Sequence, residues 1–521
     1  MQFKDISEIQ HATRRTQREF FRFGMGLLFV VSIMIYASLG LGTTGTNGVM
    51  LVVASMIGGY MAMNIGANDV ANNVGPAVGS KSISMLGAIL IAAVFEVMGA
   101  LIAGGDVVST VSGNIIDMHA VATPLHFLAL MTAALLAGAL WLNFATAVGA
   151  PVSTTHSIVG AILGAGIAAG GFGAAHWSVV GTIVASWIIS PILGGLIAAG
   201  FLYWIKQAIT YKTDMVAAAQ RTVPILLGIM AFAFSTYIIM KGFGKIWKVG
   251  FPAAAVMGLA CGVLVWLVLR PVLARRAAAL KNTKKSINSL FTIPLICAAA
   301  LLSFAHGAND VANAIGPLSA IADTVMHGEV SATAGIPFWV MLIGALGIAL
   351  GLALYGPKLI RTVGGEITDL DQMRAFSIAM AAAVTVIVAS QLGLPVSSTH
   401  IAIGGIFGVG FLREHLKSNY SRMLEEIKHR HSGADKQDVE TFLNQFAQAD
   451  IDVKKAMLKQ LKAHTVDITL TKKEYKKMRK VYKGELVKRD AVRKIVAAWV
   501  VTVPVSALLG ALVYTIIGAL L

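Results

Sequence analysis

Long apolar runs separated by short polar segments recur along the whole chain. A helix that crosses a bilayer needs roughly 20 apolar residues. Runs of about this length lie at residues 23–42, 50–66, 84–104, 125–148, 178–204, 222–241, 251–269, 290–305, 337–356, 375–393 and 495–520. Two more runs, at 152–170 and 396–412, either cross or dip in and return. The runs are unbroken rather than alternating, which favours helices over a β-barrel. The pattern therefore predicts an all-α, polytopic membrane protein.

The composition agrees with this class. Of 521 residues, 56% are hydrophobic and 13% are charged, which excludes an ordinary soluble domain. The net charge of +16 is unevenly placed: residues 413–494 hold 21 Lys and Arg against 12 Asp and Glu, and within them Val453, Met457 and Leu461 have helical spacing. We expect this segment to be a small helical cytoplasmic insertion, because positive charge beside membrane spans is first an orientation signal. A nucleic-acid partner is not expected.

Two polar motifs occur twice within apolar surroundings. Residues 66–76 are GANDVANNVGP and residues 307–317 are GANDVANAIGP. A second pair follows, with GAPVSTTH at 149–156 and GLPVSSTH at 393–400. The similar offsets predict an internal duplication, and Gly and Pro within the motifs predict broken or re-entrant helices.

The positive-inside rule places the two copies in opposite orientations. The basic N-terminal arm should be cytoplasmic and the C-terminus outside, so the twin segments enter the membrane from opposite sides. This is an inverted-topology repeat, whose substrate site lies between the halves. We expect six parts along the chain. An N-terminal arm with an extra transmembrane helix takes residues 1–49, repeat 1 takes 50–204, and connecting helices with a cytoplasmic loop take 205–289. Repeat 2 takes residues 290–412, the insertion takes 413–491, and the last helix of repeat 2 takes 492–521.

The GAND motifs supply hard oxygen ligands. An Asn-Asp pair at membrane depth is costly unless it has a function. Carboxylate and amide oxygens suit Na⁺ or protonation rather than soft metals. The candidate cation-binding residues are Asn68, Asp69, Asn72, Asn309, Asp310 and Asn313. Plain helix capping or interhelical hydrogen bonding is the alternative.

The second motif pair supplies hydroxyl groups at predicted helix N-termini. Hydroxyls together with free first-turn amides form an anion-binding arrangement, although capping alone is the alternative. The candidate anion-binding residues are Ser153, Thr154, Thr155, Ser397, Ser398 and Thr399. Additional candidates are Glu96, which lies in mid-span, and the motif histidines His156 and His400; for each of them a packing role is the alternative.

The predicted spans of the two repeats contain no Lys or Arg at membrane depth. An anion and the two acids cannot share a dry pocket without compensation, because like charges repel strongly in a low dielectric. Co-bound Na⁺ or H⁺ would supply that compensation. Anion and cation binding should therefore be coupled.

The paired GANDVAN and PVSTTH/PVSSTH motifs closely resemble those of the inorganic phosphate transporter (PiT) family. The resemblance implies an inverted-repeat fold and symport of inorganic phosphate with Na⁺ or H⁺ across the plasma membrane, in bacteria the inner membrane. It assigns the GAND residues to the cation and the hydroxyl triplets to phosphate, with Na⁺ favoured by the GAND type. It implies a transporter rather than an enzyme, with no cofactor besides the co-transported ion. A symporter of sulfate or metal–phosphate and an anion channel are alternatives, and two copies could pair as a homodimer.

Overall fold

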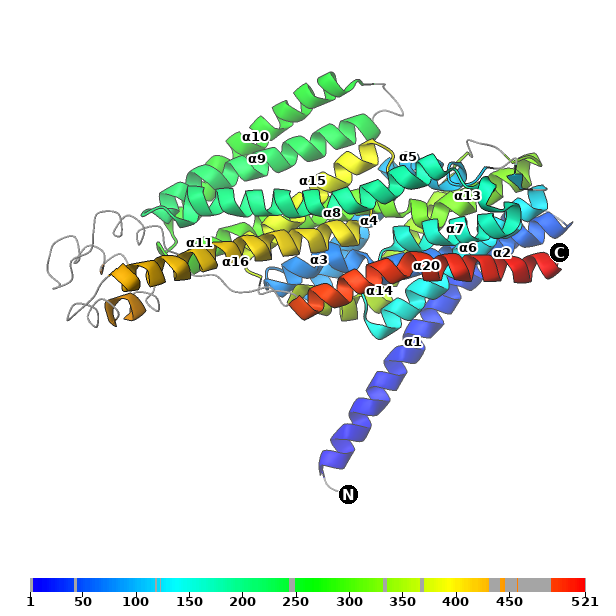
Figure 1. Ribbon diagram of the computed structural model, residues 1–521, viewed down its shortest axis with the longest axis horizontal. Helices are drawn as coiled ribbons and strands as arrows, with labels where there is room; N and C mark the ends of the chain where they lie inside the picture. Colours follow the sequence, from blue (N-terminus) through cyan, green and yellow to red (C-terminus); the bar gives the residue numbers. More distant parts are fainter. Residues whose placement is uncertain are drawn as a thin grey trace. The chain divides into compact units, whose positions relative to one another are not determined.

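The computed structural model describes residues 3–41, 45–117, 120–121, 123–242, 249–330, 335–365, 370–430, 441–445, 457 and 489–520. In this part of the chain the α-helices are α1 (Phe3–Gly40), α2 (Gly45–Asn68), α3 (Val70–Gly79), α4 (Met85–Ala103), α5 (Gly105–Gly113), α6 (Pro124–Val148), α7 (Thr154–Gly170), α8 (Trp177–Ile205), α9 (Met215–Lys241), α10 (Phe251–Ala278), α11 (Lys284–Asn288), α12 (Thr292–Asp310), α13 (Ala312–His327), α14 (Phe338–Gly365), α15 (Gln372–Gln391), α16 (Ser398–Arg430) and α20 (Arg489–Leu520). Figure 1 shows these helices.

The prediction of an all-α membrane protein is confirmed. Within the described ranges, 11 helical segments are long and apolar enough to cross a membrane, and they correspond one by one to the predicted runs. The run at 152–170 forms a shorter apolar helix, α7. The same ranges hold no β-strand, only a single isolated bridge between Ile116 and Ala175.

The chain divides into two compact units. The first comprises Met1–Ile406 and Lys488–Leu521, and the second comprises Phe407–Val487. In the second unit, α16 continues to Arg430 and residues 441–445 are helical. Val453 and Leu461 of the predicted amphipathic helix lie outside the described residues.

The two GAND segments each join two helices at a single residue. Asp69 separates α2 from α3, and Val311 separates α12 from α13. The apolar segment Gly45–Gly79 has 35 residues. A straight helix of that length would measure about 50 Å, against roughly 30 Å for the hydrocarbon core. The polar motifs lie at these single-residue breaks, where the backbone of Asp69 and Val311 keeps right-handed helical dihedral angles; the predicted re-entrant path stays a prediction.

The packing of the helices shows the duplication. Helix α2 packs on α14 as α12 packs on α4, and α2 packs on α6 as α12 packs on α15. A Cβ added at Gly66 would lie 1.9 Å from the carbonyl oxygen of Ile348, and one at Gly307 would lie 2.3 Å from that of Glu96. The motif glycines thus allow corresponding helices of opposite repeats to touch at the backbone.

Two parts of the first unit lie at its periphery. Helices α9 and α10 pair with each other along one side, and α1 packs on α2 and α14 before it diverges from the other helices toward its N-terminus (Figure 1). Many apolar side chains of α1 are exposed, such as Phe23 at 66% and Leu27 at 52%. Such a surface is stable only against lipid or another apolar partner.

Candidate functional site

All four motifs meet in one buried region of the first unit. Every candidate site residue is buried, with at most 6% of its surface exposed: Asn68, Asp69, Asn72, Glu96, Ser153, Thr154, Thr155, His156, Asn309, Asp310, Asn313, Ser397, Ser398, Thr399 and His400. Residues up to 330 positions apart are in direct contact, as shown by the hydrogen bond from Thr399 to Asp69. The structure therefore brings the predicted residues together.

The first asparagine of each motif fixes the loop that precedes the hydroxyl residues. Asn68 donates to the Thr146 hydroxyl at 3.0 Å and to the Ala150 carbonyl at 3.2 Å. In the other repeat, Asn309 donates to the Ser390 hydroxyl at 2.9 Å and to the Leu394 carbonyl at 3.2 Å. The two halves thus use the same local hydrogen bonding.

The three hydroxyls of each triplet have different roles. Ser153 is the N-cap of α7, because its oxygen accepts the His156 amide at 3.1 Å, and Ser397 accepts the His400 amide at 3.2 Å. Capping of this kind satisfies one of the free first-turn amides of a helix and leaves others for a further acceptor. The first serine of each triplet therefore caps its helix, and its predicted role in phosphate binding stays a prediction.

Of the remaining four hydroxyls, Thr155 donates to the Val396 carbonyl at 3.0 Å and the other three donate to carboxylates. Thr154 donates to Asp69 Oδ2 at 2.6 Å, and Thr399 donates to Asp69 Oδ1 at 2.8 Å. Ser398 donates to Asp310 Oδ2 at 2.8 Å. Each acid is thus held by a hydroxyl from its own repeat, and Asp69 by one from the opposite repeat as well.

The second asparagine of each GANDVAN segment links the repeats. The Asn72 amide donates to Thr399 Oγ1 at 2.7 Å, across the repeat boundary. Its counterpart Asn313 donates to the hydroxyls of Thr154 and Thr155, each at 3.1 Å. The candidate cation ligands and the candidate phosphate donors therefore form one hydrogen-bonded network.

Several acceptor oxygens in this network are buried without a partner. Among the described side chains, such atoms include the Oδ1 oxygens of Asn72, Asn309, Asp310 and Asn313. A buried acceptor left unsatisfied costs about 1–3 kcal/mol. A cluster of such oxygens between two helices is suited to coordinate a hard cation.

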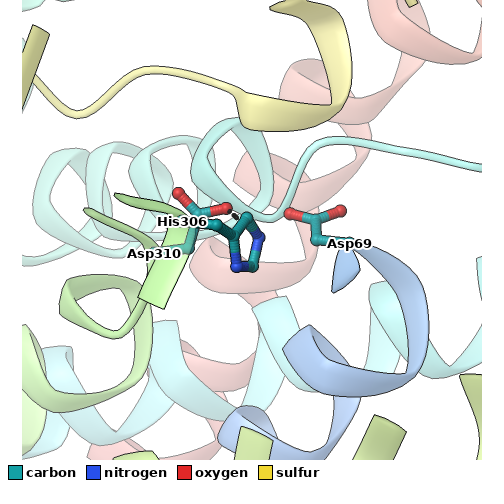
Figure 2. A group of neighbouring side chains, drawn as sticks. All are labelled: Asp69, His306 and Asp310. Atoms are coloured by element: carbon teal, nitrogen blue, oxygen red, sulfur yellow. Dashed lines mark ion pairs between the residues drawn. The ribbon is translucent and has the colours of Figure 1, made fainter. Parts of the chain in front are cut away.

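Two further buried titratable side chains, His306 and Glu96, extend the network from Asp310. His306 Nδ1 lies 2.7 Å from Glu96 Oε2, and its Nε2 lies 2.8 Å from Asp310 Oδ2. Asn73 donates to the other Glu96 oxygen at 2.7 Å. Figure 2 shows the imidazole between Asp310 and Asp69; one ligand atom from each of the three residues lies within 4.8 Å of the others.

This extension has no copy in the other half. The positions equivalent to His306 and Asn73 are Ile65 and Ala314, from the motif alignment. The position equivalent to Glu96 is Ile348, because their carbonyls occupy the same place against Gly307 and Gly66. The two carboxylate sites are therefore different. Asp310 contacts His306, whereas Ile65 stands at the equivalent position, four residues before Asp69.

Sequence reasoning identified Glu96 but missed His306. The signal was its position directly before the second GAND motif, four residues before Asp310 and on the same helical face. The expectation of no Lys or Arg at membrane depth did not consider this histidine, which is fully buried.

The motif histidines form an aromatic stack beside the centre. The rings of His156 and His400 have centroids 4.4 Å apart. Each also stacks on a tryptophan at 3.7 Å, Trp187 for His156 and Trp499 for His400. This symmetric packing joins the two repeats where their capped helices begin.

A multi-span helical protein with duplicated, interrupted helices around a buried polar centre has the architecture of a membrane transporter. Comparison with known proteins agrees. The model of the phosphate transporter family matches residues 65–510, so the chain belongs to that family. This confirms the resemblance found in the sequence, and the family consists of transporters rather than enzymes.

The relatives cover the chain well. A protein of Helicobacter pylori (strain J99) with the name "Putative phosphate permease" is 50% identical over 528 residues, covering 99% of each chain. A Pyrococcus furiosus protein with a similar name is 38% identical over 365 residues, covering 70% of this chain and 88% of its own. A solved structure with the name "The sodium-dependent phosphate transporter" has a TM-score of 0.74 at 29% identity, covering 91% of this chain and 100% of that one.

Proposed function

We propose that this protein couples the uptake of inorganic phosphate to Na⁺ by alternating access. The main support is that the hydroxyls expected to bind the anion donate hydrogen bonds to the carboxylates expected to bind the cation. Thr154 and Thr399 both donate to Asp69, and Ser398 donates to Asp310. The similar solved structure is named for both sodium and phosphate, which supports the same assignment.

The network suggests how coupling arises. With the carboxylates uncompensated, the hydroxyl protons point toward them and are not offered to an anion. When Na⁺ binds the carboxylate and amide oxygens, it replaces those donors and removes the repulsion of a second anion. The hydroxyls of Thr154, Ser398 and Thr399 then donate to phosphate oxygens, together with first-turn amides of α7 and α16. Each ligand thereby raises the affinity for the other.

The proposed orientation rests on the positive-inside rule. The basic N-terminal arm and residues 413–491 lie in the cytoplasm, the C-terminus lies outside, and the membrane is the plasma membrane, which is the inner membrane in a bacterium. Phosphate and Na⁺ would enter together from the outer side. This part of the proposal is tested separately, by labelling of single cysteines placed in the loops.

The test of coupling is uptake of radiolabelled phosphate into proteoliposomes. An imposed Na⁺ gradient should drive phosphate accumulation, and replacing Na⁺ by choline should abolish it. Equal accumulation in choline with a pH gradient would assign the coupling to H⁺, and equilibration without accumulation would indicate a channel. Inhibition by excess sulfate as strong as that by arsenate would make sulfate the better candidate substrate.

One variant pair tests the network itself. Thr399→Val removes a hydroxyl that donates to Asp69 and accepts from Asn72. It should raise both the phosphate and the Na⁺ concentrations for half-maximal uptake. Thr182→Val is the matched control, since its hydroxyl bonds only the Ser178 carbonyl on an exposed face of α8. A Thr399→Val protein that changes the phosphate dependence but not the Na⁺ dependence would contradict the proposed link.

A further inference from the structure

A cavity of about 850 Å³ lies between α1 and the helices behind it, and it borders the buried polar centre through Ala67 and Thr146. Its walls come from α1, α2, α6 and α14. One end carries the charged and polar side chains Glu19, Arg22, Asn64 and Lys358. The other end, two helical turns further along α1, is lined by Leu27, Val30, Met56 and Ile57. The cavity is thus polar at one end and apolar at the other.

The polar end has an excess of positive charge. Arg22 pairs with Glu19 at 2.8 Å, and Lys358 donates to the Ala147 carbonyl at 2.7 Å. Arg22 and Lys358 also line a second cavity of about 780 Å³, in which Arg361 is a further basic wall residue. Three cations and one carboxylate therefore surround the junction of the two cavities.

We propose that this cavity binds an anionic phospholipid. Its phosphate would lie between Arg22 and Lys358, close to Arg361, and one acyl chain would follow Leu27, Val30 and Met56. The apolar end favours a lipid over free phosphate, which has nothing to place there. Helix α1, which forms one wall of the cavity, diverges from the other helices toward its N-terminus (Figure 1). Basic residues at the membrane surface are the usual partners of acidic lipids.

The site also has a path to the transport centre. Lys358 holds the carbonyl of Ala147, close to the end of α6, and Thr146 in the same wall accepts from Asn68. A lipid that engages Lys358 would therefore act beside the loop that Asn68 holds.

The test is lipid binding to the purified full-length protein in detergent, measured by native mass spectrometry with phosphatidylglycerol and phosphatidylcholine. Phosphatidylglycerol should bind more tightly, and affinity should fall about fivefold for each basic residue removed in Arg22→Gln and Lys358→Gln. Val30→Trp, which fills the apolar end, should weaken binding of both lipids. Arg276→Gln, an exposed arginine at the end of α10, is the control and should change nothing.

The outcomes separate the sources of the phosphate group. Binding that persists in excess inorganic phosphate or glycerol phosphate supports a lipid, whereas displacement by either would overturn the proposal in favour of a free anion. Unchanged phosphatidylglycerol binding in the Arg22→Gln/Lys358→Gln protein would also overturn it. Equal losses in Arg276→Gln would show only general attraction of acidic lipids and would refute a defined site.

Discussion

The contact of His306 with Glu96 and Asp310 makes a quantitative prediction, because the other half of the protein carries isoleucine at the positions of His306 and Glu96. His306 lies between Glu96 and Asp310 with all three side chains fully buried. His306→Ile leaves the buried carboxylates of Glu96 and Asp310 without their histidine partner. Glu96→Ile leaves His306 with Asp310 as its single carboxylate partner. Breaking a buried pair by removing one member costs about 3–5 kcal/mol.

The double variant should cost far less than the sum of the single ones. Ile65 and Ile348 occupy the equivalent positions in the other repeat, so an isoleucine pair fits this kind of site. The remaining losses are the contact of His306 with Asp310 and the Asn73 hydrogen bond, the latter worth about 1 kcal/mol. We expect the double variant to be about as stable as either single variant, which gives a coupling energy of about 3 kcal/mol.

The measurement is the free energy of unfolding from denaturant titration of the four proteins under reversible conditions, in which this energy falls linearly with denaturant. Ile348→Val, at the apolar counterpart of Glu96, is the matched control and should cost about 0.5–1.5 kcal/mol. If the single costs add to within about 0.5 kcal/mol, the two residues do not act as a pair and the reasoning is wrong.

Other predictions concern the packing and the two acids. Gly66→Ala places a methyl group against the Ile348 carbonyl, at 1.9 Å without relaxation, and should sharply lower the yield of folded protein, whereas Gly24→Ala, which meets no atom within 4 Å, should not; size-exclusion profiles in detergent distinguish them. Asp69→Asn and Asp310→Asn should each raise the Na⁺ concentration for half-maximal uptake about tenfold or more, since a charge-assisted contact is worth about 1.5–3 kcal/mol. Normal Na⁺ activation of both variants in proteoliposomes would remove the acids from the proposed mechanism.

The sequence predicted the elements and the meeting of the motifs for a definite reason. Polar residues in apolar runs are costly, so two nearly identical polar motifs indicate two functional copies rather than chance. Hydrophobic runs also predict spanning helices well, because the bilayer requires satisfied backbone groups. The helix count, the interruptions at the GAND motifs and the contact of the PVS motifs with them were therefore accessible before any coordinates.

The division of roles within the hydroxyl triplets was not accessible. Ser153, Thr154 and Thr155 are chemically similar, and a shift of the helix start by one residue would exchange their roles. Only the structure shows that Ser153 caps α7 while Thr154 contacts Asp69. His306 was missed for a different reason. A comparison of the repeats identifies the residues that both contain, and the other repeat has isoleucine, Ile65, at the equivalent position.

The combination of symmetric and asymmetric features bears on how such a transporter could work. The network is shared between the repeats, because Asn72 contacts Thr399 and Asn313 contacts Thr154 and Thr155. A movement of one repeat against the other must therefore alter the proposed cation and anion contacts together, which is the condition for the proposed coupling. The contact of His306 with Asp310 makes the two carboxylates inequivalent, so they should contribute unequally to Na⁺ binding. Equal losses of Na⁺ affinity in Asp69→Asn and Asp310→Asn, measured by calorimetric titration, would show that His306 and Glu96 serve only packing.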